Sequence, residues 1–104
     1  MHLAVSFRLF LGGAFFANSV PHLTNGVSGR PFQTPVASPP GKGLSSSTVN
    51  VLWGFANLLA AYLLVFRAST FNVQDIGQVL LLGAGALIVS VFNARHFGQF
   101  HGGR

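Results

Sequence analysis

The sequence has no cysteine, and Asp75 is its only acidic residue. Without cysteine there is no disulfide framework, no thiolate nucleophile and no cysteine-ligated metal site. With one carboxylate there is no pair of acids for general acid–base catalysis, and transport driven by carboxylates inside a membrane is disfavoured. A catalytic Ser–His pair that uses one of the serines at 45–47 is still compatible with the sequence, but no motif brings a histidine next to these serines. We therefore expect no enzyme.

Charge of either sign is also scarce, since 7% of the 104 residues are charged while 50% are hydrophobic. A soluble domain is nearer a quarter charged, and one this apolar would expose large hydrophobic patches. The composition therefore predicts a membrane protein. Its net charge of +5 comes from cations that stand singly between apolar runs, which favours anchoring beside anionic lipid over nucleic-acid binding. These cations are Arg8, Arg30, Lys42, Arg67, Arg95 and Arg104.

Three long apolar runs dominate the chain. The most complete is residues 49–66, VNVLWGFANLLAAYLLVF, which is uncharged and would form a helix about 27 Å long, close to the thickness of a bilayer core. We expect an all-α membrane protein with transmembrane helices at about 3–20, 49–66 and 76–92 in one domain of residues 1–104. The first helix should end at Pro21, and a signal peptide is its competing interpretation.

The connections differ in length and character. Residues 24–47 are rich in proline and glycine, so we expect a long extramembrane loop with neither helix nor strand. Residues 68–75 form a short polar connection, which predicts that the second and third helices are antiparallel neighbours. Ser47 or Thr48 should cap the second helix and Asp75 the start of the third. Residues 93–104 read as a polar tail.

An up-down-up order of three helices places the long loop and the tail on the same side. Arg30, Lys42, Arg95 and Arg104 lie on that side, whereas Arg8 and Arg67 lie on the other and are partly offset by the single acid. The positive-inside rule then favours a cytoplasmic loop and tail with the N-terminus outside.

The first helix has a face of residues spaced three or four apart: Arg8, Gly12, Phe15, Ser19 and His22. We interpret it as a helix-packing face with an arginine that reaches the membrane edge. The alternative is a polar seam along a cavity, in which Arg8 binds an anion or a lipid headgroup.

The second helix carries a comparable face made of Asn50, Trp53, Gly54, Asn57 and Ala61. Asn50 and Asn57 are seven residues apart and can hydrogen-bond neighbouring helices at about 0.6–2 kcal/mol each. We expect them to join helices, and a substrate site is the less favoured alternative.

The third helix has a stripe of small residues, Gly83, Ala86, Ser90 and Asn93. Helices in lipid associate through close backbone approach, so this stripe should receive another helix or a partner.

Histidine provides the only candidate cofactor ligands. His22, His96 and His101 fall on one side of a three-span topology, where His22 and His96 could ligate haem iron or another metal. The spacing matches no recognised ligand motif and no carboxylate is near to orient the rings. We predict no cofactor and no metal site, and expect these histidines to bond loop carbonyls or headgroups.

The segment Asn18–Pro31, NSVPHLTNGVSGRP, is followed by Phe32, by Pro39-Pro40-Gly41 and by LSSSTVNVLWG. This pattern resembles small integral membrane proteins of bacteria that have no assigned activity. The resemblance covers roughly a third of the chain and implies an inner-membrane location. It implies no catalytic residue or cofactor, and it marks the loop as the distinctive part of the molecule.

The expected function is that of a non-enzymatic accessory or assembly subunit of a larger membrane complex, in contact with lipid and with partner subunits or further copies of itself. The alternatives are a small homo-oligomeric channel or transporter for an anion or small solute, and a haem- or metal-binding electron-transfer subunit.

Overall fold

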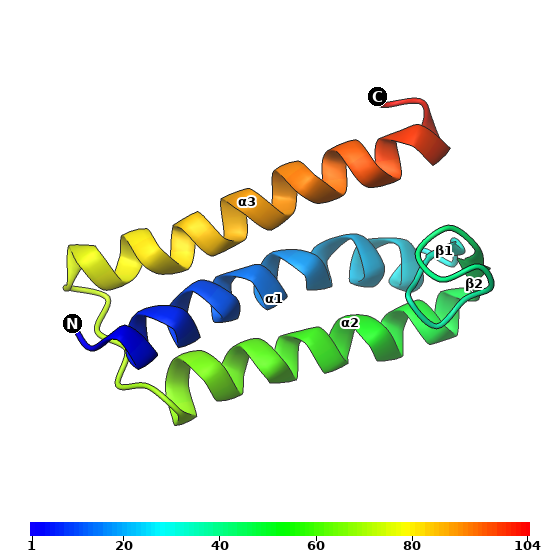
Figure 1. The fold of residues 1–104 in the computed structure, drawn as a ribbon. Helices are drawn as coiled ribbons and strands as arrows, with labels where there is room; N and C mark the ends of the chain where they lie inside the picture. Colours follow the sequence, from blue (N-terminus) through cyan, green and yellow to red (C-terminus); the bar gives the residue numbers. More distant parts are fainter.

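The computed structural model describes all residues 1–104 and has three long helices with a short hairpin between the first two (Figure 1). Helix α1 is Leu3–Val27, α2 is Ser47–Tyr62 with a π-helical turn at Leu63–Arg67, and α3 is Ile76–His101. Strands β1 (Phe32–Gln33) and β2 (Leu44–Ser45) are antiparallel. All three helices, counting α2 with its π turn, are long and apolar enough to cross a membrane. The expected all-α fold is therefore confirmed at this level.

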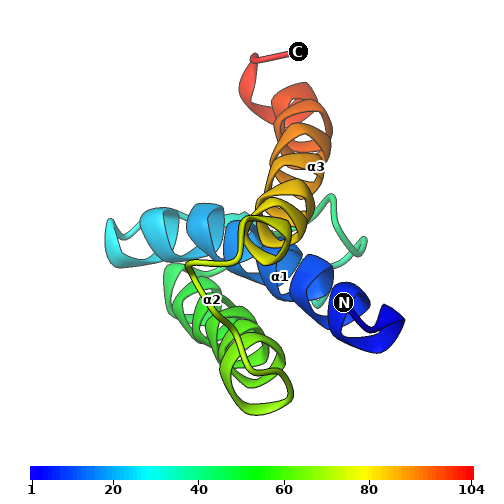
Figure 2. The ribbon, with the colours of Figure 1, turned by 90° about the vertical axis from the view of Figure 1, so that its left-hand side faces the viewer.

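Helix α1 lies in the middle of the molecule, with α2 and α3 on its opposite sides (Figures 1 and 2). The three helices run up, down and up, so α2 and α3 are antiparallel as predicted. They are not neighbours, however, because they make almost no contact with each other. The short connection joins only the ends of α2 and α3 and does not make them pack along their lengths. Helix α1 lies between them instead, because it has small residues on both of its faces.

Glycines make both of these close helix contacts possible. A Cβ atom at Gly13 would stand 1.9 Å from the carbonyl oxygen of Leu82, and one at Gly85 would stand 1.9 Å from that of Phe10. On the other side of α1, a Cβ at Gly54 would come within 2.6 Å of Leu23. The helix backbones thus approach more closely than any side chain would allow, which strengthens their van der Waals contact.

The first helix is longer than predicted, because it continues through Pro21 to Val27. Proline removes the backbone donor that would bond the Ala17 carbonyl, and side chains in the next turn add hydrogen bonds to other carbonyls of the helix. Thr24 Oγ1 donates to the carbonyl of Val20 over 2.7 Å, and Asn25 Nδ2 donates to that of Pro21 over 2.7 Å. The extra turns project toward the loop and pack on the start of α2.

The other helix ends also differ in detail from the prediction. Ser46, rather than Ser47 or Thr48, caps α2 by accepting a bond from the Val49 amide over 3.2 Å. Asp75 caps α3 as predicted, accepting from the Gln78 amide over 3.3 Å. Helix α3 then continues past the predicted end at 92 to His101, so most of the expected polar tail is helical. Hydropathy marks where the apolar segment ends, whereas backbone hydrogen bonds decide where the helix ends.

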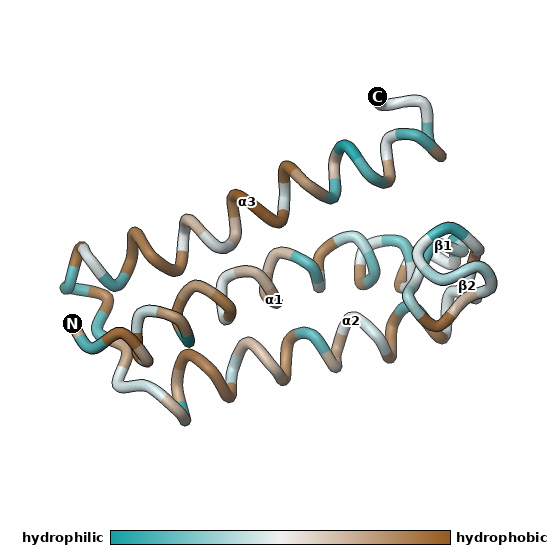
Figure 3. Tube along the Cα trace, in the orientation of Figure 1, coloured by the Kyte–Doolittle hydropathy of each residue, from teal (hydrophilic) through white to brown (hydrophobic).

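The loop contains a hairpin, contrary to the expectation of no regular structure. Phe32 pairs with Ser45 and Gln33 with Leu44, although each strand has only two residues. Phe32, Gln33 and Thr34 are buried, and this burial compensates for the weak local propensity. Polar residues gather around the loop and the neighbouring end of α3 (Figure 3).

Matched glycine substitutions on α3 test the packing of α1 against α3. Gly85→Ala should lower the free energy of unfolding by about 1–3 kcal/mol, because its methyl group meets the Phe10 carbonyl. Gly83→Ala should leave it unchanged or raise it by up to about 1 kcal/mol, because nothing lies within 4 Å of its Cβ and alanine favours the helix. The fluorescence of Trp53, the only tryptophan, during denaturant titration in detergent measures both. Equal effects at the two positions would contradict this packing.

Candidate functional site

A buried hydrogen bond between His22 and Asn50 joins α1 to α2 beneath the loop. His22 Nδ1 and Asn50 Oδ1 are 2.8 Å apart, and the two residues are 1% and 0% exposed. Asn50 Nδ2 donates to the carbonyls of Phe32 at 3.1 Å and Ser45 at 3.2 Å. Since the amide nitrogen faces these carbonyls, its oxygen is the acceptor and His22 Nδ1 is the donor. One asparagine therefore holds α1, α2 and both strands of the hairpin.

Aromatic rings enclose this hydrogen bond. The His22 ring meets Phe32, Trp53 and Phe97 edge-on, at centroid distances of 5.6, 6.4 and 6.2 Å. Phe32 comes from the loop, Trp53 from α2 and Phe97 from α3, so all four parts of the fold meet at His22. Edge-to-face contacts of this kind add about 0.5–1.5 kcal/mol each between aromatic rings.

Two further histidines hold the loop from α3. His96 Nε2 donates to the Gly41 carbonyl over 2.8 Å. His101 Nε2 donates to Gln33 Oε1 over 2.9 Å, and its ring stacks on Phe32 at 5.1 Å. These histidines bond loop groups, and no cluster of three or more His, Cys, Asp or Glu side chains is arranged to hold a metal. Haem ligation by His22 Nδ1 or His96 Nε2 would require these bonds to break.

A second polar element links all three helices through asparagine side chains. Asn18 Nδ2 on α1 donates to Asn57 Oδ1 on α2 over 3.0 Å, and Asn93 Nδ2 on α3 donates to Asn18 Oδ1 over 2.9 Å. Asn57 Nδ2 in turn donates to the Trp53 carbonyl over 2.8 Å. We call Asn57, Asn18 and Asn93 the asparagine relay. It couples α2 to α3 although these helices do not pack on each other.

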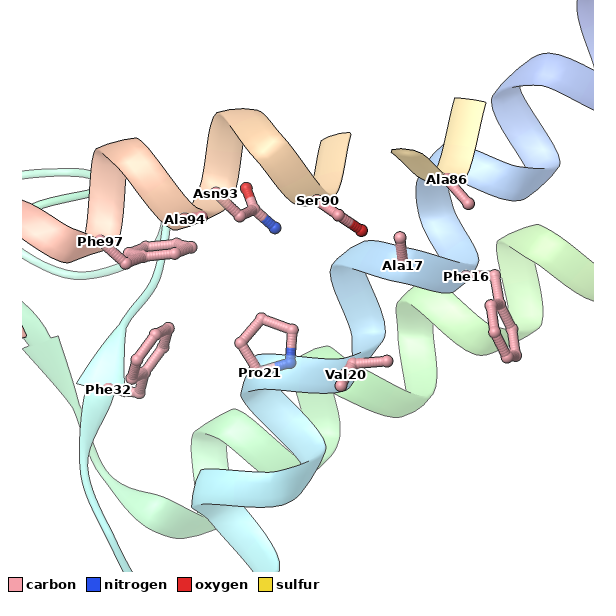
Figure 4. Close-up of a pocket in the computed structure, with 10 residues that line it drawn as sticks. All are labelled: Phe16, Ala17, Val20, Pro21, Phe32, Ala86, Ser90, Asn93, Ala94 and Phe97. Carbon is pink, nitrogen blue, oxygen red and sulfur yellow. The ribbon is translucent and has the colours of Figure 1, made fainter. Parts of the chain in front are cut away.

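A cleft of about 470 Å³ lies between α1 and α3 beside the relay (Figure 4). Its walls are mostly apolar, and Ser90 and Asn93 are the only polar side chains that line it. Phe32 and Phe97 lie at the end of the cleft nearest the loop (Figure 4). The other lining residues are Phe16, Ala17, Val20, Pro21, Ala86 and Ala94.

A second apolar cleft of about 380 Å³ lies nearer the connection between α2 and α3. Phe16 lines both clefts, so they adjoin along α1 on one face of the molecule. This face is a groove above α1, with α3 on one side and part of α2 on the other. The second cleft is lined by Gly12, Leu58, Ala61, Tyr62, Val65, Phe66, Phe71 and Leu82 together with Phe16.

The residues singled out on the first helix have different surroundings. Gly12, Ser19 and His22 are buried toward α2, whereas Phe15 is 37% exposed. Arg8 lies at the other end of the molecule, where its Nη1 donates to the Ala68 carbonyl over 2.9 Å. Arg8 therefore ties α1 to the end of the π-helical turn.

The stripe on α3 only partly faces α1. Asn93 bonds Asn18, and a Cβ at Gly13 would come within 3.1 Å of the Ala86 amide nitrogen, but Gly83 faces away from α1. A Cβ at Gly83 would have no atom within 4 Å, whereas Gly85 lies directly against α1. Ala86 and Ser90 line the cleft beside this contact. Successive side chains of a helix are rotated by about 100°, so Gly83 and Gly85, which are two residues apart, lie on different faces of α3.

Asn18 and the pair Gly13 and Gly85 are the important residues that sequence reasoning passed over. Asn18 is an amide inside an otherwise apolar run, which is a signal for a polar partner on a neighbouring helix. It lies outside the face that contains Arg8 and His22, so the spacing of that face does not include Asn18. Its two partners are 39 and 75 residues away, and no local spacing reveals them.

No family model, curated protein or solved structure matches this chain. The function therefore has to follow from the contacts described above. The features that bear on function are the buried bond between His22 and Asn50, the part-buried asparagine relay, an apolar groove and a third helix that is packed along one side only.

Asn50→Leu should release the loop while leaving the helices assembled. The substitution removes the bonds to His22 and to the carbonyls of the hairpin, so hydrogen exchange and proteolysis should increase within residues 28–46. Asn57→Leu is the matched control, since it removes a buried asparagine of the same helix that does not touch the loop. Equal loop protection in both variants would contradict this role of Asn50.

The asparagine relay should behave as a coupled unit. Asn18→Leu removes both interhelical bonds and should cost about 1–3 kcal/mol, more than Asn57→Leu or Asn93→Leu alone. A double-mutant cycle between positions 18 and 93 should give a coupling energy of about 0.5–1 kcal/mol. Strict additivity in detergent unfolding would show that this bond contributes nothing.

Proposed function

We propose that this chain is a multi-pass protein of the bacterial inner membrane that serves as a non-enzymatic accessory or assembly subunit of a larger membrane complex. The observation that carries the proposal is the exposure of α3. Only 6% of the apolar window of α3 is buried within the chain, against 22% for α1 and 28% for α2. Helix α3 is held along one side by α1, and the rest of its surface is available to lipid and to a partner.

The small residues of α3 support a protein partner on part of this surface. A Cβ at Gly83 would have no atom within 4 Å, so no contact within the chain requires a glycine at this position. In a lipid environment a glycine of this kind permits the close approach of another helix. Gly83 continues the line of Ala86 and Ser90 along the edge of the α1–α3 cleft, and a partner helix laid along this line would cover both.

The loop provides a second surface for the same partner. Its inner residues are fixed by Asn50, His96 and His101, while Val36 on its outer side is 67% exposed. A loop held at several points loses little conformational entropy on binding. The basic residues at this end favour a cytoplasmic position.

The polar side chains that a channel would need along its path are already engaged. Asn50 bonds His22 and the hairpin, Asn57 bonds Asn18, and Arg8 bonds the Ala68 carbonyl. These contacts favour a structural role for all three side chains over the lining of a solute pathway.

Gly83→Leu tests the proposal directly. The variant should fold like the wild type, because the new side chain enters open space, yet it should recover at least about tenfold less partner on purification in mild detergent. Mass spectrometry against the wild-type sample measures the loss.

Ile88→Phe is the matched control. It adds bulk at an exposed position of α3 about 140° around the helix from Gly83, and should leave recovery unchanged. Unaltered partner recovery with Gly83→Leu, or wild-type protein that purifies alone as a monomer, would refute the proposal.

A further inference from the structure

A small basic pocket lies at the end of α3 that adjoins the loop, separate from the α1–α3 cleft. It has a volume of about 220 Å³ and is lined by Phe92, Arg95, His96, Gln99 and Arg104. Four of these five side chains are polar, and two are permanently charged. The only acid of the chain, Asp75, caps the opposite end of the same helix. The pocket therefore holds two arginines with no acidic side chain nearby.

The fold of the helix end brings the two arginines to one place. Gly102 has a φ of +78°, and the Gly103 amide donates back to the Gly98 carbonyl over 3.0 Å. This turn directs the chain back along α3, and a Cβ at Gly98 would lie 3.3 Å from the Cβ of Arg104. Gly98 thus leaves the space that Arg104 needs to line the same pocket as Arg95.

The two guanidinium groups of the pocket are free to bind a ligand. Arg8 and Arg30 donate to the Ala68 carbonyl and to Asn25 Oδ1, whereas neither Arg95 nor Arg104 has a hydrogen-bond partner in the chain. Arg95 also lies nearly two turns before the end of α3, too far for it to complement the helix dipole in the last turn. The charge of Arg95 therefore has no structural role inside the chain.

The other lining residues suit an amphiphilic anion. His96 Nε2 donates to the Gly41 carbonyl, and Gln99 Nε2 donates to the His96 carbonyl over 2.9 Å, which fixes one wall. Phe92 stacks on His96 at 5.8 Å and gives the pocket an apolar side toward the hydrophobic part of α3. Guanidinium groups bind phosphate oxygens in pairs, and an apolar wall suits the start of an acyl chain.

We infer that this pocket binds a phosphate group through Arg95 and Arg104. The same chemistry is offered by the headgroup of an anionic phospholipid and by a soluble phosphate ester. The inference is independent of the partner proposed for α3, because it concerns a different surface and needs no second protein.

Lipid retention in nanodiscs tests the site. Wild-type protein and the variants Arg95→Gln and Arg104→Gln are reconstituted in phosphatidylcholine with a minor fraction of phosphatidylglycerol, and native mass spectrometry counts the bound lipid. Each variant should retain phosphatidylglycerol about tenfold more weakly, because each loses one charge-assisted contact. Arg30→Gln removes an engaged arginine from the same end of the molecule and should change retention less than about twofold.

A second arm separates the two sources of phosphate. Glycerol 3-phosphate is titrated into detergent-solubilised protein without lipid, and binding is followed by isothermal titration calorimetry. Binding that is lost in Arg95→Gln supports the site with a soluble ligand, whereas lipid retention that depends on Arg95 without such binding supports the phospholipid. Retention and titration that are the same in Arg95→Gln, Arg104→Gln and Arg30→Gln would overturn the inference. Unchanged Trp53 fluorescence verifies that each variant is folded.

Discussion

The hydrogen bond between His22 and Asn50 is the contact on which the loop end of this molecule depends. Both partners are buried, and the asparagine uses its amide nitrogen to hold the hairpin while its oxygen holds α1. Losing it would leave several buried polar groups without partners, which is costly in an apolar environment. Because the loop closes over this bond and is also bonded by His96 and His101 from α3, a few tertiary hydrogen bonds order a segment that is rich in proline and glycine.

The central position of α1 explains the rest of the architecture. Close glycine contacts bring α2 to one side of α1 and α3 to the other, and Asn18 then links a partner on each side. The result is a layer of three helices rather than a closed bundle. A layer leaves grooves above α1 and leaves most of α3 uncovered, and it is this surface that supports the proposed role as a subunit.

The surfaces left open differ in chemistry, so they suit different ligands. The edge of the α1–α3 cleft is apolar and carries small residues, which fits a helix in lipid. The pocket at the end of α3 is basic and has no acidic side chain near it, which fits a phosphate group. These two surfaces lie on the same helix, and His96, which bonds the loop, lines the basic pocket.

The sequence by itself determined the class of fold, the number of long helices, the cap at Asp75 and the polar character of the loop. These follow from composition and local spacing, which report whether each segment suits an apolar solvent. It also drew attention to His22, Asn50 and Asn57 one by one. Only the tertiary structure decided that His22 bonds Asn50, that Asn18 joins Asn57 to Asn93, and that Gly85 rather than Gly83 faces α1. It alone placed α1 between the other helices, carried α1 past Pro21 and paired the two short strands. The physical reason is that most of these features depend on partners far away in the chain, from 11 residues for the pair Gln33 and Leu44 to 75 residues for Asn18 and Asn93. They depend also on which face of a helix a residue occupies, which changes by about 100° per residue and which mean hydropathy does not report.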